Sequence, residues 1–186
     1  DVESAKIAAG RVLDDYQRLG RLPELAPIAR ENGLAAFGDY SGESVRDVLS
    51  AFLGRVKPGD YLTVQAYLAP DEMTTRQLGR LQSALRRACG CAVTAGYGPR
   101  FLHSTGQLHK GDGGRGHFIQ ITSDASVDLP VPRTARATES DYSFGTLLAA
   151  QALGDWQALQ QRGRHVIRLH AEADVLSGLE QLLAFI

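Results

Sequence analysis

Four short apolar runs, most of them followed by a helical pattern, constrain the fold of this chain more than any other feature. They contain many β-branched and aromatic residues and are apolar almost throughout. The runs are Asp60–Leu68, Ala92–Ala95, Phe118–Thr122 and Arg164–His170. Strands of this kind that alternate with helices belong to a mostly parallel sheet covered on both faces. The pattern therefore predicts a three-layer α/β/α fold.

Apolar residues at helical spacing predict five helices around these strands. Gly20 ends the first helix, which covers residues 1–19. The other four are predicted to begin at capping residues, which are Ser41, Asp71, Ser143 and Asp174. Residues 34–40 are expected to form an edge strand, and 123–141 an extended surface connection. We expect one domain over residues 1–186, with a helical lead-in over 1–59 and an α/β core over 60–186.

Charge and composition exclude several classes of partner. The net charge of −1 gives no long-range attraction to nucleic acid. No apolar run approaches the roughly 20 residues needed to span a bilayer, and no signal-peptide pattern opens the chain. Cys89 and Cys91 match neither a redox nor a zinc pair, which favours inert thiols in a reducing cytoplasm. Because the chain begins with Asp1, we expect a fragment of a longer protein.

The segment Tyr97–His117 concentrates residues that carry chemistry. It holds three of the five histidines and one of the three lysines, and it lies between two predicted strands. Functional residues in α/β domains gather in loops at the carboxyl ends of strands. We therefore expect the functional site in this segment, which we call the central loop.

A phosphate site is one interpretation of the central loop. Ser104, Thr105 and Gly106 supply two hydroxyls and an unhindered backbone N–H, which favour phosphate where a helical turn begins. Arg100 and Lys110 would add charge-assisted contacts. The alternative is a loop in which the two hydroxyls only cap a turn.

The histidines of the central loop leave further alternatives open. His103 and His109 flank the hydroxyls and have the pKa range for proton transfer, although a structural role is the other reading. A metal site is not favoured, because the spacing of the candidate ligands matches no zinc signature. Those ligands would be His103, His109, Asp112 and His117. The glycine spacing also does not match a dinucleotide fingerprint, so no cofactor is expected.

Two stretches in and just before the central loop, Gly96–Arg100 and Leu102–Gly111, resemble the C-terminal part of bifunctional transaldolase–glucose-6-phosphate isomerase proteins. Asp141–Gly145 and Ala150–Asp155 fit the same family, and the resemblance extends over essentially the whole chain. It implies a sugar-isomerase (SIS-like) domain of the doubly wound, flavodoxin-like type that handles phosphosugars.

The resemblance also implies roles for individual residues. Asp1–Lys6 is similar to an end motif of glucose-6-phosphate isomerases whose lysine contacts substrate, which makes Lys6 a catalytic candidate. His109 precedes a glycine-rich turn and a strand, as the ring-opening histidine of the isomerases does. The sequence departs from the family at Asp1, where a glycine is usual, and at Asp112, which would place a carboxylate near any phosphate.

The expected function is therefore that of a C-terminal domain in a bifunctional transaldolase–glucose-6-phosphate isomerase. It would bind a phosphosugar and contribute to aldose–ketose isomerisation together with upstream domains. The motif of the glutamate base is not found, and a transaldolase barrel needs about 250 residues, so the chain alone is not expected to be a complete enzyme. The alternative is a non-catalytic packing or oligomerisation domain derived from a duplicated sugar-isomerase domain. A free-standing phosphosugar sensor is a third reading.

Overall fold

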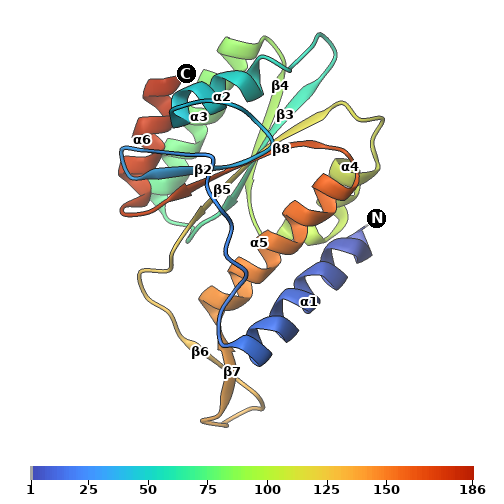
Figure 1. The fold of residues 1–186 in the computed structure, drawn as a ribbon, viewed down its shortest axis with the longest axis vertical. Helices are drawn as coiled ribbons and strands as arrows, with labels where there is room; N and C mark the ends of the chain where they lie inside the picture. The colour runs from blue at the N-terminus through green and yellow to red at the C-terminus, as the bar shows by residue number, and fades with distance from the viewer. Residues whose placement is uncertain (1) are drawn as a thin grey trace.

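A computed structural model describes residues 2–186, with the side chain of Val2 excepted (Figure 1). Six helices, one 3₁₀ turn and eight strands are present in these residues. In chain order they are α1 Val2–Leu19, β1 Ala29–Glu31, β2 Leu34–Gly38, α2 Val45–Leu53, β3 Tyr61–Tyr67, α3 Glu72–Cys89, β4 Ala92–Tyr97, η1 Arg100–Leu102, α4 Ser104–Gly111, β5 Gly116–Ser123, β6 Pro130–Pro132, β7 Ser140–Ser143, α5 Phe144–Gln161, β8 His165–Ala171 and α6 Val175–Phe185.

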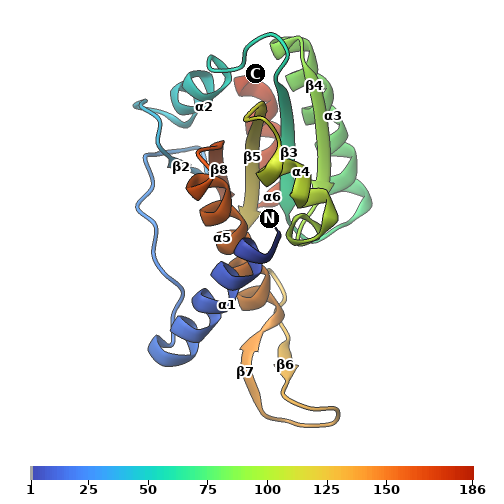
Figure 2. The same cartoon turned by 90° about the vertical axis from the view of Figure 1, so that its right-hand side faces the viewer.

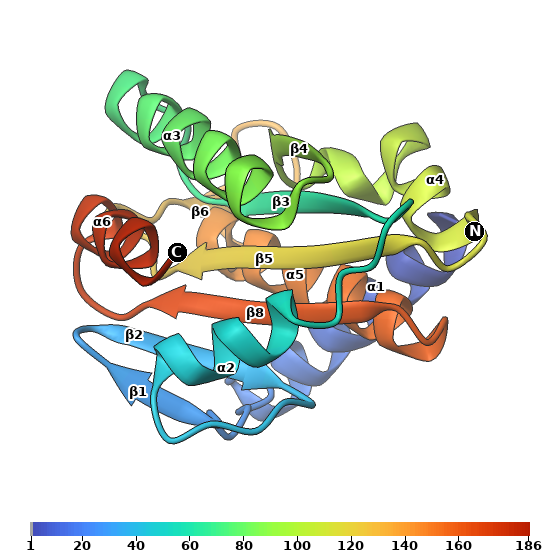
Figure 3. The same cartoon turned by 90° about the horizontal axis from the view of Figure 1, so that it is seen from above.

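Six of the strands form one sheet in the order β1-β2-β8-β5-β3-β4. The four predicted strands β3, β4, β5 and β8 are parallel, whereas β1 and β2 are antiparallel to their neighbours. Helices α2, α3 and α6 cover one face, and α1 and α5 cover the other, as Figure 3 shows from above. The three-layer α/β/α prediction is confirmed.

The two faces of the sheet differ in chemistry, because successive side chains of a strand point to opposite faces. On β3, Leu62, Val64 and Ala66 belong to the large apolar core beneath α2, α3 and α6. The intervening positions of β3 face α1 and α5, and they include the buried Gln65. Polar groups within a doubly covered sheet are costly unless they are hydrogen-bonded. The α1–α5 face is therefore where the fold departs from a simple apolar core.

The local predictions need three corrections. Helix α2 is capped by Ser44, not Ser41, and Ser44 forms a capping box with Asp47. The strand expected at an edge, β2, is interior, because the unpredicted strand β1 pairs outside it through a turn at Asn32 and Gly33. Residues 1–59 are more than a helical lead-in, since they supply two strands of the sheet and two covering helices.

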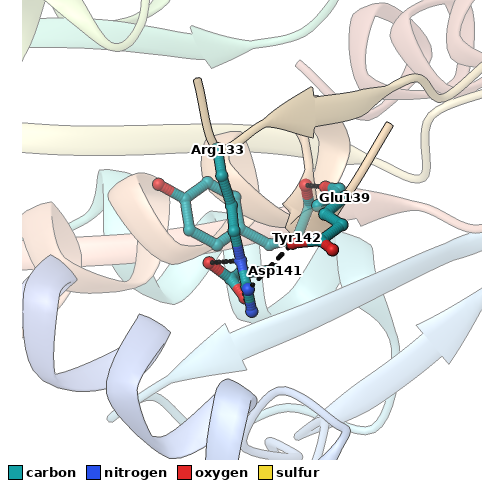
Figure 4. A network of polar contacts seen from close by, with 5 residues as sticks. Arg133, Glu139, Asp141 and Tyr142 are labelled. Atoms are coloured by element: carbon teal, nitrogen blue, oxygen red, sulfur yellow. Dashed lines mark hydrogen bonds and ion pairs between the residues drawn. The ribbon is translucent and has the colours of Figure 1, made fainter. Parts of the chain in front are cut away.

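The predicted surface connection 123–141 contains a small hairpin of β6 and β7 that projects from the body (Figures 1 and 2). Arg133 holds this hairpin together. Its Nε lies 2.9 Å from both carboxylate oxygens of Asp141, and its Nη1 lies 3.3 Å from Glu139 Oε2 (Figure 4). These contacts lower the pKa of the Asp141 carboxyl. The hairpin is thus ordered by its own side chains.

Helices α1 and α5 approach so closely that only glycine fits at position 154. A Cβ atom there would lie 2.5 Å from Ala9 N and 2.7 Å from Ala5 O. Since these are backbone atoms of α1, the substitution Gly154→Ala must move a helix. We expect it to lower the free energy of unfolding by about 1–3 kcal/mol, measured by urea denaturation.

Gly79 offers a matched control for this test, because it also lies inside a helix, α3, but faces open space. Gly79→Ala is expected to raise the free energy of unfolding by about 0.5–1 kcal/mol, since alanine is the better helix former. Equal stabilisation by both substitutions would contradict the close packing of α1 on α5.

Candidate functional site

The central loop folds into η1 and α4, which connect the carboxyl end of β4 to the amino end of β5. Arg100, His103, Ser104 and Thr105 are exposed at and before the first turn of α4. Gly106 is buried, and a Cβ atom there would lie 1.6 Å from Phe101 O. The glycine therefore permits α4 to start directly against η1. The first turn of α4 presents two hydroxyls to solvent.

His109 and Lys110 lie on the inner side of α4, which corrects the expectation that they contact a ligand. His109 packs between the rings of Phe101 and Phe118, with its Nδ1 3.3 Å from Gln65 Nε2. Burial and the neighbouring Lys110 lower the pKa of His109 to about 4. A buried, neutral imidazole is not placed to donate a proton to a sugar at neutral pH.

Lys110 is fully buried and forms an ion pair with the equally buried Asp155 of α5. Its Nζ also donates to Phe101 O at 3.1 Å. The carboxylate of Asp112, expected near a phosphate, is 3.0 Å from Arg164 at the other end of α4. The charged groups in the second half of α4 are thus paired within the protein.

Lys6 is exposed on α1, and the structure brings this part of α1 next to the central loop. Ala5 and Ala9 pack against Phe101 and Leu102 of η1 in one apolar cluster. Asp1, the other notable position of the end motif, lies outside the described residues. The surface candidates that the fold gathers in this region are Lys6, Arg100, His103, Ser104 and Thr105.

A second polar region lies on the sheet face beneath α5. Gln65 of β3, Gln120 of β5 and Arg168 of β8 are direct neighbours across the strands. Arg168 Nε donates to Gln120 Oε1 at 2.8 Å, and Gln120 Nε2 donates to Ala152 O at 3.1 Å. These residues form a buried polar row across the middle of the sheet.

A second row lies two residues further toward the carboxyl ends of the same strands and contains Tyr67, Thr122 and His170. Thr122 Oγ1 lies 3.0 Å from His170 Nδ1. Burial lowers the pKa of His170. The two rows lead from the centre of the sheet to its carboxyl edge.

A cleft of about 660 Å³ opens at this edge, beyond the carboxyl ends of β3, β5 and β8. Arg168 and the second polar row line its inner part, and carboxylates lie in the loops around it. Those carboxylates are Asp71, Asp124, Asp128 and Asp174. Ligands of open α/β sheets bind at this edge, where the connections leave the sheet in opposite directions. The cleft is therefore a candidate binding site by position as well as by shape.

The cleft was not predicted, because the apolar strands that end at it indicate only a buried sheet. A signal was nevertheless present, since Gln65, Gln120 and Arg168 each interrupt an apolar strand. Among the described residues that line the cleft, none belongs to the central loop. The two regions are therefore separate candidates for ligand binding.

A group of ionisable residues lies at the opposite, amino-terminal edge of the sheet. His117 Nε2 is 3.0 Å from Asp60 Oδ2, and the His117 ring stacks on His165 with 4.9 Å between centroids. Within residues 2–186, no group of three or more His, Cys, Asp or Glu residues is arranged to hold a metal ion.

None of the described helices combines the length and apolar character needed to cross a membrane.

Comparison with known proteins supports the fold. Neither a family model nor a curated protein matches the sequence. Among solved structures, the chain is similar to the crystal structure of a hypothetical protein, TT0462, from Thermus thermophilus, with a TM-score of 0.59 and 16% identity. The match covers 100% of this chain and 44% of that chain, so this chain spans less than half of that protein's length. At this identity the likeness concerns the fold alone.

Proposed function

We propose that this chain is the C-terminal phosphosugar-binding domain of a bifunctional transaldolase–glucose-6-phosphate isomerase. The observation that carries the proposal is the segment Leu102–Gly111, which resembles that family and begins α4 with exposed hydroxyls. A helix N-terminus with adjacent hydroxyls favours a phosphate group.

Cys89 and Cys91 are free thiols. Free thiols are usual in the reducing cytoplasm, which is the location we propose for the parent enzyme.

In this proposal the exposed residues divide the work of holding the substrate. Ser104 and Thr105 donate hydrogen bonds to the phosphate, and Arg100 adds a charge-assisted contact. His103 replaces His109 as the candidate acid for ring opening, because it is the exposed N-cap residue of α4. Lys6 approaches the same substrate from α1. The glutamate base that forms the enediolate belongs to an upstream domain, so isomerisation needs the full-length enzyme.

Titration calorimetry of the chain with glucose 6-phosphate, fructose 6-phosphate and 5-phosphoarabinonate tests the proposal. We expect saturable binding that Ser104→Ala weakens by roughly 10-fold or more, as for a hydrogen bond to a charged group. Ser50→Ala is the matched control, since Ser50 is exposed on α2 at the other face of the sheet. Absence of binding to the folded chain, or equal affinity for Ser104→Ala, would remove the phosphate site from the central loop.

The surface supports one other function, a packing or oligomerisation domain of the same enzyme. Ile7 and Leu19 are about half exposed on α1, and Leu129 and Phe144 are exposed beside the hairpin. A second subunit packed over these side chains would remove their apolar surface from water, which favours association. A sedimentation measurement decides this function: a dimer that Leu19→Glu converts to monomer supports it, and a monomer at all concentrations opposes it.

A further inference from the structure

The buried charges beneath α5 do not balance. Lys110 and Asp155 form an ion pair, and Asp155 is also near enough to stabilise the charge of the Arg168 guanidinium, so one buried carboxylate serves two buried cations. Arg168 is only 7% exposed. Burial lowers its pKa to about 10, so the side chain remains positively charged at neutral pH. A buried cation that shares its carboxylate with a second cation is incompletely compensated, and a bound anion would stabilise it.

One nitrogen of the Arg168 guanidinium lacks a hydrogen-bond partner among the described residues. Nε is held by Gln120 at 2.8 Å, and the guanidinium carbon lies 4.6 Å from the ring centroid of Trp156. Nη2 is buried and has no hydrogen-bond partner anywhere in the described part of the chain. Arg168 also lines the inner part of the cleft. A fixed, buried, unpartnered donor in a cleft is the arrangement expected of an anion site.

We propose that this cleft is a binding site for a small hydroxylated organic anion, whose acid group is bound by Arg168. Thr122 and His170 lie in the next row toward the mouth and supply further polar contacts to the acid group or the adjoining hydroxyl. Asp124 and Asp174, in the loops around the cleft, accept hydrogen bonds from hydroxyl groups of the same ligand. Neutral sugars lack the group that Arg168 recognises.

The carboxylates at the mouth do not overcome the attraction of Arg168. The Asp124 side chain is 93% exposed, so its repulsion of an anion is screened by water and salt. Arg168 acts in a much less polar environment, where the same charge interacts several times more strongly. The proposal is independent of the proposed function, because the cleft contains no residue of the central loop.

The intrinsic fluorescence of Trp156 can report ligand binding in this cleft. Trp156 is the only tryptophan in the sequence, and its ring stacks on the Arg168 guanidinium. We expect intrinsic fluorescence to change saturably on addition of gluconate or glucose 6-phosphate, at ionic strength held constant with chloride. Glucose is expected to cause no change. Gluconate alone identifies a carboxylate ligand, glucose 6-phosphate alone identifies a phosphate ester, and both together identify an oxyanion site in general.

Two variants test the contact residues. Arg168→Met keeps an apolar stem beneath Trp156 and is expected to weaken binding by roughly 100-fold. Thr122→Val preserves the volume of a second cleft residue and is expected to weaken binding by roughly 10-fold, which keeps the test decisive if Arg168→Met fails to fold. Ser50→Ala, on α2 at the other face of the sheet, is the control that should leave the response unchanged.

Three results would overturn the proposal. The first is the absence of a saturable fluorescence change with both gluconate and glucose 6-phosphate. The second is an unchanged response in folded Arg168→Met or in Thr122→Val. The third is loss of the response in Ser104→Ala. In the first case water, rather than a ligand, satisfies Arg168 Nη2. The last result would assign the anion to the central loop and support the proposed function instead.

Discussion

Replacing Lys110 with methionine is expected to lower the free energy of unfolding by about 3–5 kcal/mol, the range for removing one partner of a buried ion pair. Lys110 and Asp155 have no solvent-exposed side-chain surface. The substitution leaves the carboxylate of Asp155 buried without its cation. Urea denaturation of wild type and Lys110→Met at pH 7 measures the loss.

The pH dependence of this loss identifies its cause. Burial raises the pKa of Asp155, and Lys110 opposes that rise. Without Lys110 the pKa of Asp155 rises further, so the folded variant holds a proton that the unfolded chain releases above about pH 4. Stability of the variant therefore falls as the pH rises from about 4. The difference from wild type should be smallest in acid and largest at neutral pH.

A double variant provides the control. Lys110→Met combined with Asp155→Leu removes both charges and fills the space with apolar atoms. Such replacements are often neutral or stabilising, so we expect the double variant to recover most of the lost stability. A loss below about 1 kcal/mol for Lys110→Met, or no recovery in the double variant, would show that the pair is not a buried charge interaction.

The strands and most helices were predictable from sequence because their signals are local. Apolar runs define β3 and β8, and side-chain caps at Asp71, Ser143 and Asp174 begin α3, α5 and α6 as predicted. The pairing of β1 with β2 was missed, since β1 has only three residues and no periodicity to detect. The turn between them, Asn32–Gly33, is nevertheless a hairpin signal of the expected kind.

The orientation of α4 was not predictable, because partners far along the chain decide it. Ser104 and Thr105 face solvent, while Lys110 turns inward to reach Asp155, 45 residues later. Ser104, Thr105 and Lys110 all lie on this short helix, and the sequence alone does not indicate which side of the helix will be covered. The catalytic reading of His109 rested on its neighbours in sequence, whereas its burial results from packing against Phe118.

The buried polar row shows a different limit. Each of Gln65, Gln120 and Arg168 could be seen as a polar residue within an apolar strand. Their alignment depends on the register of three parallel strands, which the sequence alone does not determine. A one-residue shift of β8 would turn Arg168 to the opposite face. The site therefore emerges only when the strands are paired.

Acidification from pH 6.5 to 4 is expected to remove about 3 kcal/mol of unfolding free energy through His109 alone. Burial and Lys110 lower the pKa of His109 in the folded protein to about 4, against about 6.5 in the unfolded chain. In this interval the unfolded chain takes up a proton that the folded protein does not. The contribution of neutral His109 to stability is therefore fully present above about pH 6.5 and is lost as the pH falls toward 4. The size follows from about 1.36 kcal/mol per pKa unit.

Urea denaturation across this pH range measures the slope for wild type, His109→Asn and Ser104→Ala. Asparagine at 109 retains an acceptor for Gln65 and does not titrate, so its slope should be shallower by about one proton. Ser104→Ala, at the exposed start of α4, removes no titratable group and should leave the slope unchanged. The lowered pKa values of His165 and His170 add to the slope in all three proteins. Equal slopes for wild type and His109→Asn would mean that His109 is protonated alike in both states. That outcome would restore His109, in place of His103, as the candidate acid for ring opening.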